Sequence, residues 1–340
     1  EGIEKISKQI VELNPKAVCV SKKIFAKLKD LFPKIIVYDN INIMLEEQKT
    51  DVTLHAISGV FGVECVIEAI SNTKVLALAN KECIVSAWKF IEEKSIEYGV
   101  QIIPVDSEHN SLYRILELVD SSIIANVSIT ASGGPFFGKN INLKKVTPLQ
   151  AIKHPNWKMG KKISIDSANL MNKILEVIEA SLIFNLPISK FKIIIHPQSL
   201  IHAVVEFKNG LSSMLYHYND MKIPIANSLY SNFYINKPSG NNFSFQKNLS
   251  FHNADIKKIP SIKILKLTKI LNDKGFILIN SLNEILVEKF MENKILFTDI
   301  VHKLLSILDS KAVKNHLKNH QIRHIKDVFK TYNFSRSLVN

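Results

Sequence analysis

Two carboxylates, Asp106 and Glu108, follow the apolar stretch from Val100 to Val105 in the order Asp-Ser-Glu. In an extended chain, side chains two residues apart project from one face, which would bring both carboxylates together at the carboxyl end of a strand. Ligands of open α/β sheets bind beyond that end. Two hard oxygen donors there favour Mg²⁺ or Mn²⁺. Taken alone, such a pair more often lies in a solvated turn that caps the next helix.

A second polar segment contains Asp166 and Ser167, which precede a run with helical spacing. The backbone N–H groups and the Ser167 hydroxyl would then hold a phosphate at the helix start. Asn172 and Glu176 are four residues apart, with Lys173 beside them, and share one face of this helix. The segment predicts a donor, a cation and a third carboxylate in one pocket, although a capped amphipathic helix with surface charges fits it equally.

Two loops add further candidates. Ser132 and the two glycines after it follow an apolar strand pattern, and glycines allow the backbone to approach an anion closely. A simple turn explains that loop as well. Trp157, one of only two tryptophans, lies between a proline and a glycine, as a lid that excludes water would require. A packed surface loop is the alternative for this second segment.

Composition restricts the class of protein. The chain has 340 residues, of which 46% are hydrophobic, and it contains 44 basic and 31 acidic side chains. This length and apolar content indicate a globular protein of two or three domains. Apolar runs such as Val75 to Ala79 are far too short to cross a bilayer, so no membrane association is expected. The net charge of +13 suits a small phosphorylated anion, and nucleic-acid binding is an alternative that rests on charge alone.

The three cysteines are Cys19, Cys65 and Cys83. Their odd number and wide spacing favour neither a disulfide framework nor a zinc site, so a reducing compartment is expected. All three lie in apolar stretches and are predicted to be buried thiols.

Hydrophobic periodicity divides the chain into parts. Residues 1–105 alternate between helical and strand patterns, which predicts a parallel sheet covered by helices, with Ser21 capping one of them. In residues 106–230 the strands follow one another, and Asn209-Gly210 between two apolar runs predicts a hairpin in an α+β domain. Residues 231–256 are rich in Asn and Ser and predict a linker. Residues 257–340 carry amphipathic patterns of a small helical domain.

Several motifs occur together in one order along the chain. They are Leu78-Ala-Asn-Lys-Glu82, Pro104-Val-Asp-Ser-Glu-His109, Ser132-Gly-Gly-Pro-Phe136, His154-Pro-Asn-Trp157, Asp166-Ser-Ala168 and Ile195-His-Pro-Gln-Ser199. In this combination the chain resembles the 1-deoxy-D-xylulose 5-phosphate reductoisomerases of the methylerythritol phosphate route to isoprenoid precursors. The resemblance implies a Rossmann-like domain, an α+β catalytic domain with a lid near residues 153–162, and a C-terminal helical bundle.

The resemblance also implies an activity and its cofactors. The enzymes of this family use NADPH and Mg²⁺ or Mn²⁺, with Co²⁺ as a further option, to isomerise and reduce 1-deoxy-D-xylulose 5-phosphate to 2-C-methyl-D-erythritol 4-phosphate. A homodimer is implied, without nucleic acid or membrane partners. The implied location is the bacterial cytoplasm, or alternatively a plastid stroma or relict plastid.

The roles of individual residues are likewise implied by the resemblance. The metal ligands would be Asp106, Glu108 and Glu176, with Lys81 and His154 as further catalytic residues. The substrate would contact Lys81, Ser107, Glu108, Ser132, His154, Ser167, Asn172, Lys173 and Glu176. NADPH would contact Asn80, Glu82, Gly160 and Met221. The lid would carry Trp157 and Met159.

Three histidines and one absent motif complete the comparison with the family pattern. His202 is expected near the substrate, whereas His109 and His196 are expected to support the structure by hydrogen bonding.

The family's Gly-Ser-Thr-Gly-Ser-Ile-Gly turn, which holds the cofactor diphosphate, is not present in residues 1–60. We therefore expect that the first βαβ unit is missing. The alternative function is a non-catalytic or cofactor-deficient remnant that binds a phosphorylated ligand or a partner.

Overall fold

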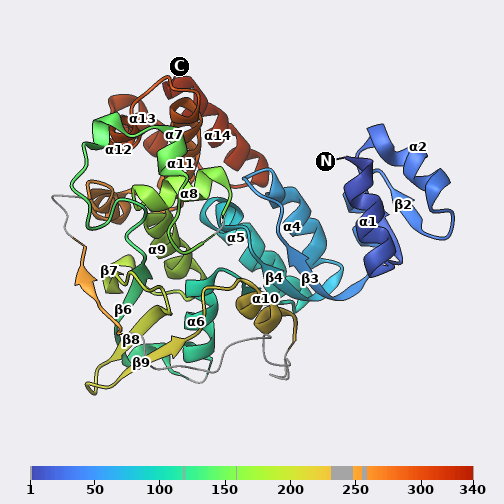
Figure 1. The fold of residues 1–340 in the computed structure, drawn as a ribbon, viewed down its shortest axis with the longest axis horizontal. Helices are drawn as coiled ribbons and strands as arrows, with labels where there is room; N and C mark the ends of the chain where they lie inside the picture. Colours follow the sequence, from blue (N-terminus) through green and yellow to red (C-terminus); the bar gives the residue numbers. More distant parts are fainter. Residues whose placement is uncertain (1, 118, 158, 231–247, 255–258, 340) are drawn as a thin grey trace.

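The computed structural model describes residues 2–117, 119–157, 159–230, 248–254 and 259–339 (Figure 1). Helices and strands alternate in the first part, as predicted. In chain order they are α1 (Ile3–Leu13), β1 (Ala17–Cys19), α2 (Lys22–Leu31), β2 (Ile36–Tyr38), α3 (Ile41–Glu47), β3 (Thr50–His55), α4 (Gly62–Ile70), β4 (Thr73–Leu78), α5 (Lys81–Tyr98) and β5 (Gln101–Pro104).

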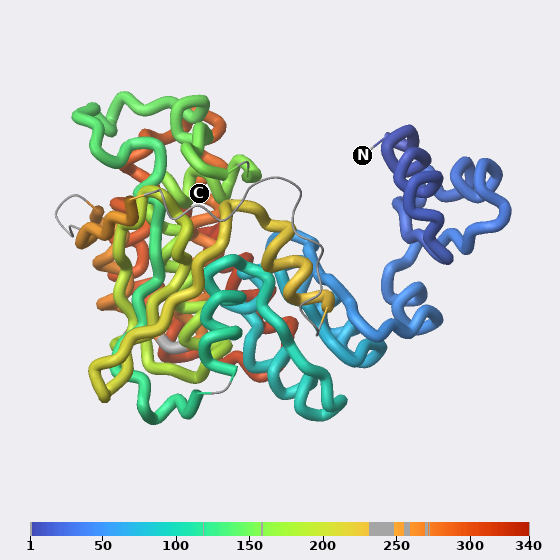
Figure 2. Tube along the Cα trace, turned by 60° about the horizontal axis from the view of Figure 1, so that its bottom comes forward, coloured from blue at the N-terminus to red at the C-terminus, as the bar shows by residue number. Residues whose placement is uncertain are grey.

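The strands of this part are parallel, which confirms that aspect of the prediction, but they form two sheets. One has the order β3-β4-β5, and the other contains only β1 and β2. Both views show α1, α2 and the β1–β2 pair to one side of the remaining chain (Figures 1 and 2). The alternating pattern predicted strands correctly, but it carries no information on which strands pair, because pairing depends on contacts distant in sequence.

The middle part is built on a mixed sheet of order β10-β7-β6-β8-β9. Its strands are β6 (Ile124–Ala131), β7 (Phe191–Ile195), β8 (Ile201–Phe207), β9 (Ser212–Tyr216) and β10 (His252–Asn253). Strand β6 is parallel to β7 and antiparallel to β8. The predicted hairpin is confirmed by the antiparallel β8–β9 pair, whose turn contains Gly210 with φ +87°. The predicted linker lies mostly outside the described residues, and its described part adds the short strand β10.

Helices surround this sheet and form the C-terminal part. They are α6 (Ser107–Leu116), α7 (Pro148–Ala151), α8 (Lys161–Ala168), α9 (Met171–Ile183), α10 (Lys222–Leu229), α11 (Ile262–Met291), α12 (Phe297–Leu308), α13 (Lys311–Asn319) and α14 (Ile325–Val339), with short 3₁₀ turns at Ser121–Ile123, Leu143–Lys145 and Ile188–Lys190. The fully buried Ile174, Leu282 and Leu304 belong to one core in which α9, α11 and α12 pack together. The predicted α/β fold with a helical C-terminal part is thus confirmed.

Two local predictions need comment. Ser21 is the N-cap residue of α2, as predicted, although its side chain makes no capping hydrogen bond. Only Cys83 is buried, whereas Cys19 and Cys65 are half-buried, because β1 and α4 each have a face that is incompletely covered. Within the described part of the chain, no helix combines the length and the apolar character that crossing a bilayer requires.

Candidate active site

Three carboxylates from two helices meet at the start of α6. Asp106 is the N-cap residue of this helix, where its Oδ1 accepts a hydrogen bond from the Ser107 N–H at 3.1 Å. The expected extended geometry of Asp106 and Glu108 was therefore wrong, because the helix begins between them. Their convergence with Glu176 is nevertheless found: one oxygen of each carboxylate lies within 4.8 Å of the others. All three side chains have little contact with solvent.

Two lysines lie among these carboxylates. The Lys81 Nζ atom is 2.7 Å from Asp106 Oδ2 and 3.3 Å from Glu176 Oε1. The Lys173 Nζ atom is 2.6 Å from Glu176 Oε2 and also contacts Glu108. Two ammonium groups thus face three carboxylates, which leaves an excess of negative charge in a buried place.

Amide and hydroxyl groups complete the contacts of this cluster. The Asn172 Oδ1 atom accepts a hydrogen bond from Lys81 Nζ at 2.7 Å, and the Asn172 amide donates to Glu176. The Ser107 hydroxyl donates to Glu108 Oε2 at 2.6 Å. The prediction that Asn172, Lys173 and Glu176 share one helix face therefore agrees with the structure, in which these residues contact one another.

The environment separates the proton affinities of these groups. Burial, with the charge of Glu108, raises the pKa of Glu176 to about 7. Burial alone would also raise the pKa of Glu108, but the Lys173 ammonium outweighs it and holds that pKa below the usual range. Asp106 is likewise lowered in pKa, because Lys81 outweighs the effect of burial. A cluster of like charges in which the pKa of one member is raised to near neutrality is typical of a functional site.

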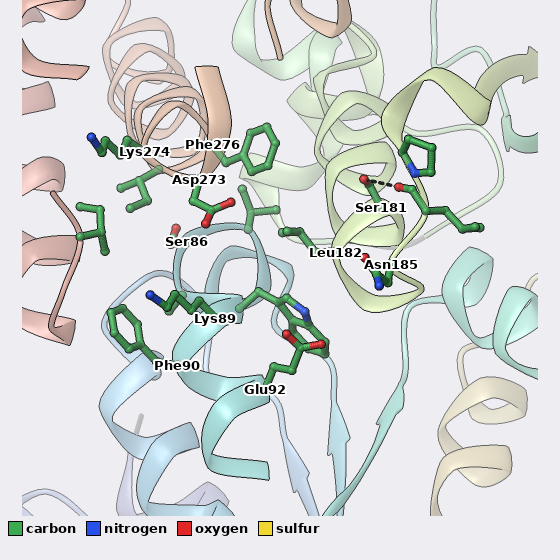
Figure 3. A pocket seen from close by; sticks show the side chains of 17 residues that line it. Ser86, Lys89, Phe90, Glu92, Ser181, Leu182, Asn185, Asp273, Lys274 and Phe276 are labelled. Atoms are coloured by element: carbon green, nitrogen blue, oxygen red, sulfur yellow. Dashed lines mark hydrogen bonds between the residues drawn. The ribbon is translucent and has the colours of Figure 1, made fainter. Parts of the chain in front are cut away.

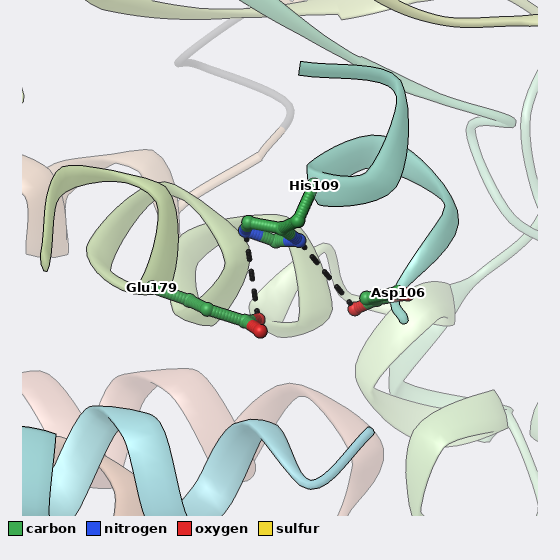
Figure 4. A group of neighbouring side chains, drawn as sticks. All are labelled: Asp106, His109 and Glu179. Carbon is green, nitrogen blue, oxygen red and sulfur yellow. Dashed lines mark ion pairs between the residues drawn. The ribbon is translucent and has the colours of Figure 1, made fainter. Parts of the chain in front are cut away.

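A second acidic group lies behind the first. His109 Nδ1 is 3.9 Å from Asp106, and His109 Nε2 is 3.6 Å from Glu179 (Figure 4). The Nε2–H donates to the Glu176 backbone oxygen at 2.9 Å, which fixes the tautomer of the ring. Burial lowers the pKa of His109, and burial with Asp106 raises that of Glu179. This second group offers two carboxylates and one imidazole, whereas Asp106, Glu108 and Glu176 offer three carboxylates, so the latter set is the better site for a hard divalent cation.

The loop after β6 holds a serine ready to donate. His154 Nδ1 accepts hydrogen bonds from the backbone N–H groups of Asn156 and Trp157, at 3.2 and 3.0 Å. In the neutral imidazole the proton is then on Nε2, which donates to Ser132 Oγ at 2.9 Å. Because the Gly134 N–H also donates to Ser132 Oγ, at 3.1 Å, the serine keeps its own proton for a ligand.

Burial and the charge of Lys173 support this protonation state. Together they lower the pKa of His154 to about 4, so the imidazole is neutral at neutral pH. The charge of Lys173 thus acts on His154, which links the Ser132–His154 pair electrostatically to the carboxylate cluster.

Ser167 does not occupy the predicted position at a helix start. It lies in the last turn of α8, and α9 begins only at Met171, after Leu170 in a left-handed conformation with φ +63°. The sequence pattern did not separate these two helices. Gly134 nevertheless brings the Ser132 loop onto this turn, since a Cβ atom added there would lie 2.8 Å from the Ser167 carbonyl oxygen.

The histidines occupy different surroundings. His202 stacks on His217 with ring centroids 3.8 Å apart, and the Trp157 ring lies 6.1 Å away. Burial and His217 lower the pKa of His202 to about 3, and Glu108 and Lys173 also act on it electrostatically. The expected proximity of His202 to the candidate site therefore agrees with the structure. His196 instead stacks on Phe251 at the β7 end of the sheet.

Residues expected to contact NADPH lie at the starts of helices. Asn80 caps α5, accepts from the Cys83 N–H at 3.0 Å, and donates to the Gly59 carbonyl at 2.9 Å. Glu82 is paired with Lys162 at 3.1 Å. Gly160 and Met221 are the N-cap residues of α8 and α10. The structure shows no direct contact between these four residues that would define a cofactor site by itself.

Two charged residues of this region were missed from the sequence. Glu179 lies three residues after Glu176, on the same face of α9, and is buried. Lys162 lies four residues before Asp166 and contacts it at 3.0 Å. Helical spacing from an already selected acidic residue was the signal that pointed to both.

A separate cavity of about 710 Å³ lies between α5, α9 and α11 (Figure 3). Ser86, Leu182 and Phe276 are among the side chains that line it. None of the predicted site residues does so, and the chemistry described above therefore belongs elsewhere, at the amino ends of α5 and α9.

Comparisons with known proteins place this geometry in a family. Models described as 1-deoxy-D-xylulose 5-phosphate reductoisomerase match residues 1–88, and models of its C-terminal domains match residues 102–184 and 217–338. The reductoisomerase of Pelagibacter ubique is 40% identical over 298 residues, which are 86% of this chain and 76% of that relative. That of Chlamydia trachomatis serovar L2 is 37% identical over 329 residues, or 94% and 86% of the two chains.

The chain belongs to the 1-deoxy-D-xylulose 5-phosphate reductoisomerase family. Solved structures of reductoisomerases have the same fold. A DOX-P reductoisomerase in complex with NADPH, fosmidomycin and magnesium superposes with a TM-score of 0.89 at 29% identity, and the match covers 98% of this chain and 88% of that chain. The enzyme from Zymomonas mobilis in complex with NADPH superposes with a TM-score of 0.85 at 30% sequence identity, and the match covers 98% of this chain and 87% of that chain.

These findings confirm the predicted family and enzyme class, an NADP-dependent reductoisomerase. They favour the predicted conversion of 1-deoxy-D-xylulose 5-phosphate over a non-catalytic remnant. The ligands named for the solved structures, NADPH and magnesium, are those predicted as cofactors.

Proposed function

We propose that this chain isomerises and reduces 1-deoxy-D-xylulose 5-phosphate to 2-C-methyl-D-erythritol 4-phosphate at the cluster formed by Asp106, Glu108 and Glu176, with NADPH and a divalent metal ion. The observation that carries the assignment of the site is the approach of these carboxylates to within 4.8 Å of one another. Lys81 and Lys173 lie among them, and the charge of Lys173 acts on His154, which is hydrogen-bonded to Ser132.

The donor set fits a divalent metal ion. Three carboxylates in a buried cluster are only partly neutralised by two ammonium groups, and the pKa of Glu176 is raised to about 7 by burial and by Glu108. A divalent cation held by Asp106, Glu108 and Glu176 would remove this excess of negative charge. Hard oxygen donors of this kind suit Mg²⁺ and Mn²⁺. When bound, such an ion supplies Lewis acidity to the oxygens of the hydroxyketone.

We assign the phosphate of the substrate to the groups beside this cluster. Ser132 has a hydroxyl proton to donate, because its oxygen already accepts from His154 and from the Gly134 N–H. Lys173 supplies a positive charge, and Ser167 lies on the turn against which Gly134 packs. Together with the Asn172 amide, these groups match the acceptor oxygens of a phosphate ester.

The remaining polar groups orient the carbon chain of the substrate. Lys81 reaches Asp106, Asn172 and Glu176, so its ammonium is held at the centre of the cluster. Ser107 is hydrogen-bonded to Glu108 and lies at the same helix start. Both are positioned to contact hydroxyl oxygens of a substrate bound at these carboxylates, while Trp157 and Met159 in the lid would exclude water.

When bound, NADPH would supply the hydride for the reduction. We propose that Asn80, Glu82, Gly160 and Met221 contact it. Support comes from the contacts of Asn80. Its amide donates to the Gly59 carbonyl, and its side-chain oxygen caps α5. The loop that contains Gly59 is thereby joined to the start of α5 at the carboxyl end of β4. That end is where nucleotides bind in parallel sheets.

A steady-state assay tests the assignment. The protein, mixed with substrate and Mg²⁺, should oxidise NADPH and form the branched polyol phosphate. Glu108→Gln should reduce kcat by at least about a hundredfold, because a charged metal ligand and one of the two carboxylate partners of Lys173 are lost together. Glu117→Gln, on the exposed end of the same helix region, is the matched control and should leave the rate unchanged. The absence of substrate-dependent NADPH oxidation in the unmodified protein would refute the proposal.

We further propose that the chain forms a homodimer. The support is the edge strand β9 and its flank, where Leu211, Met214 and Leu215 are exposed apolar residues. Exposed strand edges of this kind are typically covered by another chain. Sedimentation should show twice the monomer mass, and a monomer at micromolar concentration would contradict it.

The bacterial cytoplasm is the location we propose, since the matching relatives named above are bacterial enzymes. Fractionation of source cells with an antibody against the chain would test this, and recovery in a membrane or organelle fraction would refute it.

A further inference from the structure

One ammonium group joins α8 to the start of α5 beside the candidate active site without belonging to the carboxylate cluster. Lys162 is the second residue of α8, three positions after Met159. Its Nζ atom lies 3.1 Å from Glu82 Oε1, at the start of α5, and 3.0 Å from Asp166 Oδ2. Glu82 is adjacent to Lys81, so this contact ties the carboxyl end of the lid to the helix start that carries a candidate catalytic lysine.

The contact extends into the C-terminal helices. The second oxygen of Asp166, Oδ1, accepts a hydrogen bond from the Asn283 amide of α11 at 2.8 Å. The Asp166 side chain is only 2% exposed, that of Glu82 15% and that of Lys162 29%. Burial alone would lower the pKa of Lys162, but Asp166 and Glu82 outweigh it, and the lysine stays charged.

The other end of the lid is held differently. Asn156 donates to the Pro197 carbonyl at 2.7 Å and to Ser199 Oγ at 3.0 Å, and the His154 ring accepts from two lid N–H groups. The Asn156 bonds anchor the amino end of the lid to the loop after β7, and the His154 bonds hold that end in its local conformation. Lys162 provides the corresponding anchor at the carboxyl end.

Based on these contacts, we propose that Lys162 is a positioning residue. It fixes the start of α8 against α5, while the Asn283–Asp166 hydrogen bond holds the same helix against α11, and it thereby sets where Trp157 and Met159 stand over the site. The inference rests on the proposed function for its kinetic consequence, but not for its conformational one. A partly buried ion pair of this geometry contributes little net stability in general, because desolvation offsets the attraction. If Lys162 positions the lid, its loss should therefore change the exposure of Trp157 and the kinetics of the reaction, which a purely stabilising residue would not do.

The conformational test uses Trp157 as its own reporter. Trp88→Phe leaves Trp157 as the only tryptophan of the chain, since the sequence has two. In this background, Lys162→Met should make Trp157 fluorescence at least about twofold more sensitive to acrylamide, because the lid loses one anchor. Lys161→Met is the matched control: Lys161 is the exposed neighbour, and the described residues give it no ion pair. Lys162→Arg should keep quenching close to that of the parent protein.

The kinetic test uses the same variants with intact Trp88. Lys162→Met should lower kcat/KM for the phosphorylated substrate about tenfold or more, and Lys162→Arg should restore most of it. Urea denaturation of each variant separates loss of folding from loss of position.

If Lys162→Met does not fold, Glu82→Gln breaks the same ion pair from its other end and should reproduce the increase in quenching. Quenching and kcat/KM equal to those of Lys161→Met would overturn the proposal. Inactivity of the unmodified protein would refute the proposed function but leave the quenching test valid.

Discussion

Gly134→Ala is a sharp test of the proposed phosphate site, because the structure specifies what the added methyl group meets. Gly134 has φ +72°, in the left-handed region, and its added Cβ would lie 2.8 Å from the Ser167 carbonyl oxygen and 3.0 Å from the Ala168 Cα atom. Both are backbone atoms near the end of α8, and neither can move without displacing that turn. The Ser132 loop and the Ser167 turn must therefore separate.

The expected loss of folding stability in Gly134→Ala has two parts. An alanine in the left-handed region costs about 1–2 kcal/mol, and forcing a methyl group into a packed contact costs about 1–3 kcal/mol more. The free energy of unfolding should fall by about 2–5 kcal/mol. A lost hydrogen bond to a charged phosphate corresponds to about 1.5–3 kcal/mol. At about 1.4 kcal/mol per factor of ten, KM for the substrate should rise about ten- to hundredfold.

Gly210→Ala is the matched control. Gly210 has φ +87° in the β8–β9 turn, but an added Cβ there has no neighbour within 4 Å. It should therefore lower the free energy of unfolding by only about 1–2 kcal/mol and leave KM unchanged. Urea denaturation and initial rates at varied substrate concentration measure both effects. If the two variants match in stability and in KM, the close approach of the Ser132 loop to Ser167 has no part in substrate binding.

Four further outcomes are expected. Glu176→Gln should raise the Mg²⁺ concentration needed for half-maximal rate at least about tenfold, since a charged ligand is removed, and an unchanged requirement would exclude Glu176 as a ligand. Because burial and Glu108 raise the pKa of Glu176 to about 7, a proton competes with the metal ion below that pH. Mg²⁺ affinity measured by calorimetry should then fall as the pH drops below about 7 and level off above it, by up to about tenfold per pH unit, and a flat profile would contradict the assignment. His154, with its pKa lowered to about 4 by burial and Lys173, should show no imidazole titration by NMR near pH 6.5, the ordinary value. Cys83 is buried and its thiol pKa is raised by burial, so iodoacetamide should modify it only after unfolding, whereas modification of the native protein at Cys83 would show that α5 opens.

Much of the local structure follows from short-range patterns. The Asn209-Gly210 pair identified the β8–β9 hairpin, because glycine adopts the positive φ of the turn without steric cost. Asn172 and Glu176 could be placed on one helix face from their spacing alone. These features are predictable because each depends on residues within one or two turns of each other.

Local reasoning failed where two local choices were nearly equal. Asp106 and Glu108 were expected in an extended segment, but Asp106 accepts a backbone N–H as an N-cap, which starts α6 between them. Ser167 was expected at a helix start, but Leu170 adopts φ +63° and divides the run into α8 and α9. In each case the conformation of a single residue sets where a helix begins. For the boundary between α8 and α9 that residue is Leu170, whose side chain is buried, so its conformation is selected by tertiary packing.

The sequence by itself determined the kinds of groups at the site, their helical spacing and the alternation of strands and helices, since these follow from covalent order and short-range sterics. Only the tertiary structure decided that Lys81, distant by 95 positions from Glu176, lies 3.3 Å from it, and that Lys162 links α8 to α5. It also divided the parallel strands between two sheets. The physical reason is that such contacts form by burying distant surfaces against one another, and no pattern within a short window records which surfaces will meet.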